Sequence, residues 1–111
     1  MIINQESDGN IVILSLKGRL DTMHFPLVDK ELTSLIENNH MEIILDCKDL
    51  EYISSSGLRV MLKGLKQMET IKGRLTICNL QPQITQIFKI SGFDHLFEIY
   101  PELNQALASF N

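Results

Sequence analysis

The feature that most constrains the fold is the alternation of short apolar runs with amphipathic helical segments along residues 42–110. Residues 43–45 (Ile-Ile-Leu) show no polar alternation, which is expected of a strand whose sheet is covered by helices on both faces. Residues 57–70 place apolar side chains at helical spacing and polar side chains on the opposite face. Strands that alternate with helices form mostly parallel sheets. The sequence therefore predicts one α/β domain over residues 1–111, with a mostly parallel central sheet.

The predicted elements are an N-terminal hairpin, three further strands and about four helices, which makes a sheet of about five strands. The hairpin occupies residues 1–17, with Asp8-Gly9-Asn10 as turn residues that tolerate positive φ. The later strands are expected at residues 42–47, 75–78 and 97–100, and the helices at residues 24–38, 57–70, 81–91 and from residue 101 onward. Residues 18–21 and 46–56 are expected to leave the second and third strands as loops.

Composition excludes several classes of protein. Of the 111 residues 22% are charged, the net charge is −4, and lysines and arginines are scattered among acids. A nucleic-acid binder would show a basic face, so direct nucleic-acid binding is not expected. No apolar run is long enough to span a bilayer and no secretory signal is present, so we expect a cytoplasmic protein without membrane insertion. Cys47 and Cys78 are expected to be reduced core thiols.

The chain is organised around residues 54–57, Ser-Ser-Ser-Gly, which we call the serine step. It lies where a helix begins and where backbone N–H groups lack intrahelical partners. In one interpretation a serine is simply the N-cap. In the other, a serine carries a phosphoryl group, which the donors and the positive end of the helix would favour. Arg59 and Lys63 would add cationic partners if they turn toward the step.

Topology predicts which residues lie beside the serine step. Residues 18–21 and 46–56 follow the carboxyl ends of their strands, and such ends share one edge of a parallel sheet. Asp21 and the serine step should therefore lie close together. Asp21 is interpreted either as a turn or cap residue, or as a surface contact. Asp46 and Asp49 are expected to hold the loop that positions the serine step.

No catalytic or metal-binding pattern is present. The Gly-x-Ser-x-Gly motif and the P-loop pattern are missing, and no histidine is close in sequence to the serines. His24 and His40 are read as surface histidines, and Asp46 and Asp49 have no third ligand at a recognisable spacing. We therefore expect a protein that is not an enzyme and that uses neither a cofactor nor a metal.

Three segments carry a resemblance to a known family. Gly18-Arg19-Leu20-Asp21, residues 44–46 (Ile-Leu-Asp) and residues 52–58 (Tyr-Ile-Ser-Ser-Ser-Gly-Leu) together resemble STAS domains, and most closely those of the bacterial anti-sigma factor antagonists. The resemblance covers nearly the whole chain, including the order of its elements. The serine-glycine motif between strand and helix is fairly specific, whereas the Gly-x-Leu-Asp motif alone is weak.

The resemblance implies a phosphorylation-controlled binding protein. In this family a serine-kinase anti-sigma factor, with a histidine-kinase-like ATPase fold, binds the unmodified antagonist and thereby frees the sigma factor. Its phosphorylation of one serine ends the binding, and a PP2C-type phosphatase restores it. The family motif maps the acceptor onto Ser55, with Ser54 and Ser56 as less favoured sites. Two residues depart from the family pattern: Ser54 replaces an aspartate, and Arg59 replaces a glycine.

The resemblance also suggests a partner surface and leaves one alternative open. The predicted partner-binding residues are Asp21, Ser54, Ser56, Gly57, Arg59 and Lys63. The alternative is a STAS accessory subunit of a transporter or signalling scaffold, which would use the same edge for constitutive docking without phosphorylation.

Overall fold

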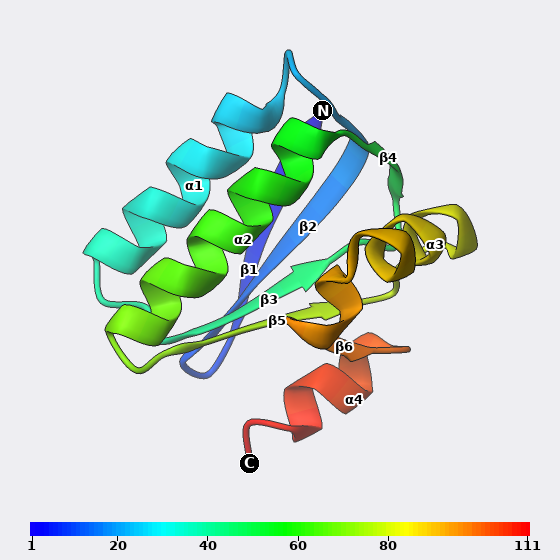
Figure 1. The fold of residues 1–111 in the computed structure, drawn as a ribbon. Coiled ribbons are helices and arrows are strands. Elements are labelled where there is room, and N and C mark those ends of the chain that lie inside the picture. The colour runs from blue at the N-terminus through cyan, green and yellow to red at the C-terminus, as the bar shows by residue number, and fades with distance from the viewer.

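A single mixed sheet of six strands forms the centre of the fold (Figure 1). The computed structural model describes residues 1–111. The strands are β1 (Ile2–Asp8), β2 (Ile11–Leu20), β3 (Glu42–Asp46), β4 (Leu50–Ile53), β5 (Arg74–Cys78) and β6 (Glu98–Tyr100). The helices are α1 (Phe25–Glu37), α2 (Ser55–Thr70), α3 (Pro82–Ser91) and α4 (Leu103–Ala108), with a 3-10 turn at Phe93–His95. The predicted α/β fold with four helices is confirmed.

Strand pairing follows the predicted topology. The order along the sheet is β1-β2-β3-β5-β6, and β4 pairs separately with β2. The leading hairpin β1–β2 is antiparallel, whereas the β2–β3, β3–β5 and β5–β6 pairs are parallel. Parallel pairs need crossover connections, and α1, α2 and α3 supply them.

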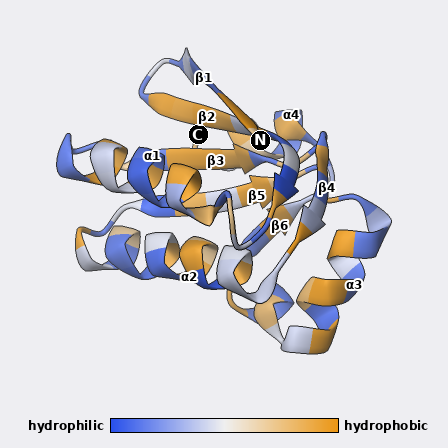
Figure 2. Cartoon of the chain, turned by 90° about the horizontal axis from the view of Figure 1, so that it is seen from above, coloured by the Kyte–Doolittle hydropathy of each residue, from blue (hydrophilic) through white to orange (hydrophobic).

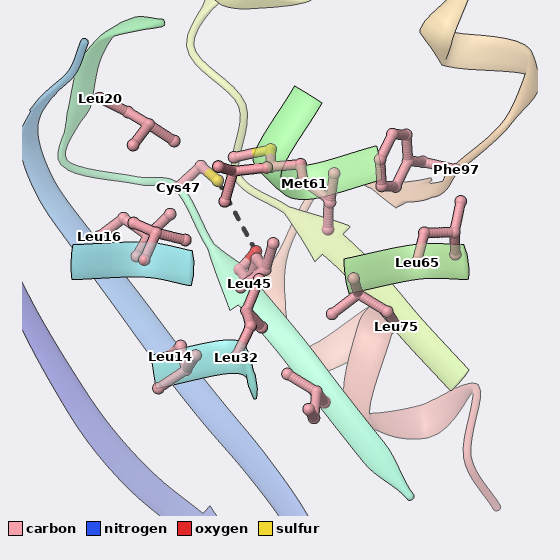
Figure 3. Packing of buried hydrophobic residues seen from close by; sticks show 14 of the residues in the cluster. Leu14, Leu16, Leu20, Leu32, Leu45, Cys47, Met61, Leu65, Leu75 and Phe97 are labelled. Carbon is pink, nitrogen blue, oxygen red and sulfur yellow. Dashed lines mark hydrogen bonds between the residues drawn. The ribbon is translucent and has the colours of Figure 1, made fainter. Parts of the chain in front are cut away.

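Two apolar layers hold the helices to the sheet. In Figure 1, α1 and α2 lie side by side against one face of the sheet, and α4 lies apart from them. Side chains of β2 alternate accordingly: Leu14 and Leu16 belong to the large cluster beneath α1 and α2, while Ile13 belongs to a smaller cluster that includes Ala106 of α4. Figure 3 shows part of the large cluster, in which Leu32 of α1 and Met61 of α2 meet the strands. Apolar residues, orange in Figure 2, accordingly lie on the strands and on the inner sides of the helices.

The structure corrects the expected loops at residues 18–21 and 46–56. β2 continues to Leu20, and Leu50–Ile53 forms β4, a sixth strand in a segment that was expected to be a loop. The β2–β3 pairing ends at Ser15, and β2 then pairs with β4 through Gly18↔Leu50 and Leu20↔Ile53. The register shifts after Gly18, whose φ of +105° suits glycine. A four-residue strand is too short to reveal itself by periodicity.

The helices match their predicted patterns with small shifts at the ends. In α2, Leu58, Met61, Leu65 and Met68 are buried as predicted, Leu62 is half-buried, and Val60 and Gly64 are buried as well. The helix begins at Ser55, two residues earlier than expected. Gly92 ends α3 in the left-handed region, with a φ of 79°. None of the helices has the length and apolar composition that a membrane crossing requires.

Both cysteines are free thiols in the interior, as predicted. Burial raises the pKa of Cys78 to about 12, and nearby Asp46 adds to this effect. Burial likewise raises the pKa of Cys47 far above its ordinary value. The nucleophilic thiolate is therefore disfavoured at both positions, and the two side chains serve as packing groups.

Candidate functional site

The end of β2 and the start of α2 meet at one edge of the sheet. The backbone N–H of Ser54 donates a hydrogen bond of 2.9 Å to the carbonyl oxygen of Leu20. Asp21 follows Leu20 directly, so the predicted proximity of Asp21 and the serine step is confirmed. The β2–β4 pairing, which ends at Leu20↔Ile53, brings the two segments to this edge together.

Gly57 lets α2 approach the strands closely. A Cβ atom at this position would lie 2.8 Å from the carbonyl oxygen of Leu20 and 2.9 Å from Cγ1 of Ile53. Gly57 is buried, so the structure places it behind the exposed surface. Gly57 thus supports the serine step by close packing, and its contact with a partner stays a prediction.

The three serines have different surroundings. Ser54 is the N-cap of α2, and its Oγ accepts a hydrogen bond of 3.2 Å from the backbone N–H of Gly57. The Oγ atoms of Ser54 and Ser56 lie 2.9 Å apart, and Ser56 Oγ lies 3.4 Å from Thr22 Oγ1. Ser55 is exposed, and its hydroxyl makes no hydrogen bond within the chain. The capping role thus belongs to Ser54, and the free hydroxyl belongs to Ser55.

Asp21 holds the turn between β2 and α1. Its Oδ1 accepts hydrogen bonds from the backbone N–H groups of Met23 (3.1 Å) and His24 (3.0 Å), and it lies 2.7 Å from His24 Nδ1. Burial alone would raise the pKa of Asp21, but the hydrogen bonds from His24 and Met23 outweigh it and lower the pKa. Asp21 is therefore a turn residue, and its contact with a partner stays a prediction. His24, expected to be a surface histidine, is only partly exposed because its ring pairs with Asp21.

The lowered pKa of Asp21 predicts an acid-dependent contribution to stability. A carboxyl group whose pKa falls on folding stabilises the fold above its unfolded-state pKa, and this stabilisation is lost as the pH falls through the folded-state pKa. Asp21→Asn should therefore lower the melting temperature at pH 7, and the difference from the parent chain should shrink below about pH 4. Melting curves of both chains at pH 7 and pH 3 test this prediction. An equal difference at both pH values would contradict it.

Cationic side chains surround the site, and most are engaged. Lys63 Nζ lies 2.9 Å from Asp29 Oδ1 of α1. The guanidinium of Arg19 lies 4.2 Å from the centre of the Tyr52 ring, and its Nε lies 3.8 Å from Asp21 Oδ2. Arg59 is exposed and has no ion pair within the chain. Of the two predicted cations, Lys63 thus turns toward α1 and Arg59 stays free.

Sequence reasoning missed several side chains at this edge. The hydroxyl of Thr22 contacts that of Ser56, and the ring of Tyr52 in β4 stacks under the guanidinium of Arg19. Met23, two residues after Asp21, is 82% exposed. Met23 and Tyr52 add exposed apolar surface to this edge. Only the short distance along the chain from Asp21 could have indicated Thr22 and Met23, because none of these residues belongs to a periodic pattern.

Of the two aspartates expected to hold the β3–β4 connection, Asp46 does so through its carboxylate and Asp49 only through its backbone. Asp46 is buried, and its Oδ1 accepts hydrogen bonds from the Lys48 backbone N–H (3.1 Å) and from Asn79 Nδ2 (3.0 Å). Asp49 contributes its carbonyl oxygen, which accepts a bond of 3.0 Å from the Gly18 backbone N–H. No three His, Cys, Asp or Glu side chains gather in a way that could hold a metal ion.

Comparison with protein families agrees with this geometry. The model of the STAS domain matches residues 3–106, which include every element from β1 to the middle of α4. The chain belongs to the STAS family. A relative in Bordetella bronchiseptica, BtrV, is assigned to the anti-sigma factor antagonists and is 31% identical over 110 residues. That alignment covers 99% of this chain and 95% of BtrV.

Solved STAS structures share the fold. A Thermotoga maritima protein, also assigned to the anti-sigma factor antagonists, superimposes with a TM-score of 0.92 at 19% identity, covering 96% of this chain and 92% of that one. The Bacillus cell-fate determinant SpoIIAA in its phosphorylated form superimposes with a TM-score of 0.76 at 21% identity, covering 99% of this chain and all (100%) of that one. At these identities the likeness establishes the STAS fold.

Proposed function

We propose that this STAS protein is an anti-sigma factor antagonist whose binding is switched by phosphorylation of Ser55. In its unmodified form it binds a serine-kinase anti-sigma factor of the histidine-kinase-like ATPase fold, and the sigma factor is released. The kinase phosphorylates Ser55 and binding ends. A PP2C-type phosphatase removes the phosphate and restores binding.

The observation that carries this proposal is the free hydroxyl of Ser55. Ser54 Oγ caps α2, and Ser56 Oγ lies within hydrogen-bonding distance of Ser54 Oγ and Thr22 Oγ1. A kinase must bring the acceptor oxygen in line with a phosphoryl group, so an exposed hydroxyl without internal partners is the accessible one. Ser55 satisfies this condition, and its place in the family motif is the acceptor position. BtrV, with the role its name assigns, supports the general function.

The arrangement of the histidine favours binding over catalysis. A serine nucleophile needs a general base within hydrogen-bond reach of its oxygen. The Nδ1 atom of His24 pairs with Asp21, and no serine hydroxyl of the step is hydrogen-bonded to the His24 ring. The Ser54 hydroxyl instead pairs with that of Ser56, which also lies near Thr22 Oγ1. We infer that a partner covers the serine step, with Asp21, Ser54, Ser56, Arg59 and Lys63 around Ser55.

A phosphoryl group at this position would act electrostatically. It adds about −1.5 to −2 charges at neutral pH. Buried against a partner without a counterion, such a charge costs desolvation free energy, and a loss of about 3 kcal/mol weakens binding more than a hundredfold. The start of α2 tolerates negative charge in the free protein, so the fold stays intact. SpoIIAA, which has the same fold, also exists in a phosphorylated form.

Phosphosite mapping tests the proposal. The parent chain and the Ser54→Ala, Ser55→Ala and Ser56→Ala variants are incubated with ATP and the anti-sigma kinase of the same organism, and the peptides are sequenced by mass spectrometry. Phosphate is expected on Ser55 in every chain except Ser55→Ala. Modification of Ser54 or Ser56 instead would overturn the assignment of Ser55. No modification, together with constitutive binding to a transporter or scaffold, would favour the accessory-subunit alternative.

A further inference from the structure

Arg59 is the cationic side chain near the serine step that has no partner. Lys63 is paired with Asp29, and Arg19 lies over the Tyr52 ring and beside Asp21. His24 is likewise paired with Asp21. Arg59, in contrast, is exposed and makes no hydrogen bond or ion pair within the chain. A guanidinium stays charged at all physiological pH values, so it is a permanent and uncommitted cation.

The helix brings Arg59 next to Ser55. The two residues are four positions apart in α2, so they lie on the same face, one turn from each other. Helical side chains lean toward the N-terminus, which directs Arg59 back over the first turn. Arg59 also lines a shallow groove between α1 and α2 together with Ser56 and Thr22, so it lies beside the first turn of α2, although Ser55 itself is outside this groove. Cβ atoms of residues four apart in a helix lie about 5–6 Å from each other, a spacing that suits a short side chain lengthened by a phosphoryl group.

We propose that Arg59 is the internal counterion of a phosphoryl group on Ser55. The proposal rests on the function proposed above. A guanidinium donates two parallel N–H hydrogen bonds to phosphate oxygens, a geometry that a lysine cannot reproduce. The pairing needs no change in the backbone of α2, because both side chains already project from neighbouring turns of one face.

The pairing changes the switch in a way that the added charge alone would not. Phosphorylation introduces a dianion, and at the same time it removes the free guanidinium of Arg59 from the surface. Any partner contact made through Arg59 is therefore lost together with the close approach of the partner to residue 55. Arg59 stands where the family pattern has glycine. In the phosphorylated state its guanidinium and the phosphoryl group thus form an ion pair within the chain.

Titration of phosphoserine at position 55 tests this pairing without a kinase or a partner. Full-length chains that carry genetically encoded phosphoserine are followed by ³¹P NMR in about 0.15 M salt. The second pKa of phosphoserine is ordinarily about 6. Arg59 should hold it lower, so Arg59→Gln should raise it by about 0.3 to 0.7 units, a roughly two- to five-fold change in proton affinity. Arg59→Lys should recover part of the shift.

Lys66→Gln is the matched control. Lys66 is also exposed on α2, but it lies eleven residues from Ser55, about 16 Å along the helix and beyond the Debye length of about 8 Å. Its removal should leave the phosphoserine pKa unchanged. Equal pKa values in the parent and in Arg59→Gln would overturn the pairing, as would equal effects of Arg59→Gln and Lys66→Gln. Because the phosphate is installed during synthesis, failure of a kinase to modify Ser55 would count only against the proposed function.

Discussion

Ser55→Asp should bind the anti-sigma factor at least a hundredfold more weakly than the parent chain, whereas Ser55→Ala should bind with unchanged affinity. Aspartate places a permanent negative charge on the exposed surface that the partner covers, and its desolvation opposes binding by about 3 kcal/mol. Alanine removes a hydroxyl that has no partner within the chain, so the fold loses nothing. Ser55→Ala should also stay bound in the presence of ATP, because it cannot be phosphorylated. Titration calorimetry with and without ATP measures both effects.

Ser7→Asp controls for the added charge. Ser7 is an exposed serine in β1 that pairs with Val12, at the opposite end of β2 from the serine step. The same substitution there should change the affinity less than twofold. Equal loss of binding in Ser7→Asp and Ser55→Asp would show a general effect of net charge. Parent-like binding by Ser55→Asp would show that Ser55 is not covered by the partner.

Gly57→Ala should destabilise the protein by about 2 to 3 kcal/mol, although alanine is normally the better residue in a helix. In an ordinary helix interior this substitution stabilises by up to about 1 kcal/mol. Here the new Cβ atom would lie 2.8 Å from both the carbonyl oxygen and Cγ of Leu20. A backbone carbonyl in a paired strand cannot move aside, so the start of α2 must shift outward. The melting temperature should fall by about 10 °C or more, and urea unfolding gives the free energy directly.

Gly64→Ala, in the same helix, is the matched control. A Cβ atom at Gly64 would come within 2.9 Å of Cδ1 of Leu32, the far end of a side chain, and 3.5 Å of Cδ2 of Leu75. These methyl groups can rotate away, so the substitution should cost less than about 1 kcal/mol. Similar losses in the two variants would mean that the approach of α2 to Leu20 is not the constraint. Gly57→Ala should also weaken partner binding, because the shift displaces the serine step.

Much of the fold and of the site could be predicted because it depends on local patterns. The i, i+3, i+4, i+7 spacing of apolar residues places α2, and the unbroken run at residues 43–45 identifies a covered strand. The nearness of Asp21 to the serine step follows from the rule that parallel strands share their carboxyl edge. β4 escaped prediction because four residues are stabilised as a strand only by pairing with β2. The roles of Thr22, Met23 and Tyr52 depend on that same pairing.

The sequence by itself determined that this chain is a STAS domain with a serine-rich start to its second helix. Those properties reside in side-chain periodicity, in turn residues and in a short motif, all of which act between neighbours along the chain. Only the tertiary structure decided that Ser54 caps, that Ser55 is free, that Lys63 is committed to Asp29 and Arg59 is not, and that Gly57 is needed for packing. The reason is that hydrogen bonds, ion pairs and steric contacts at this edge join β2, α1 and α2, and no spacing within one segment records them.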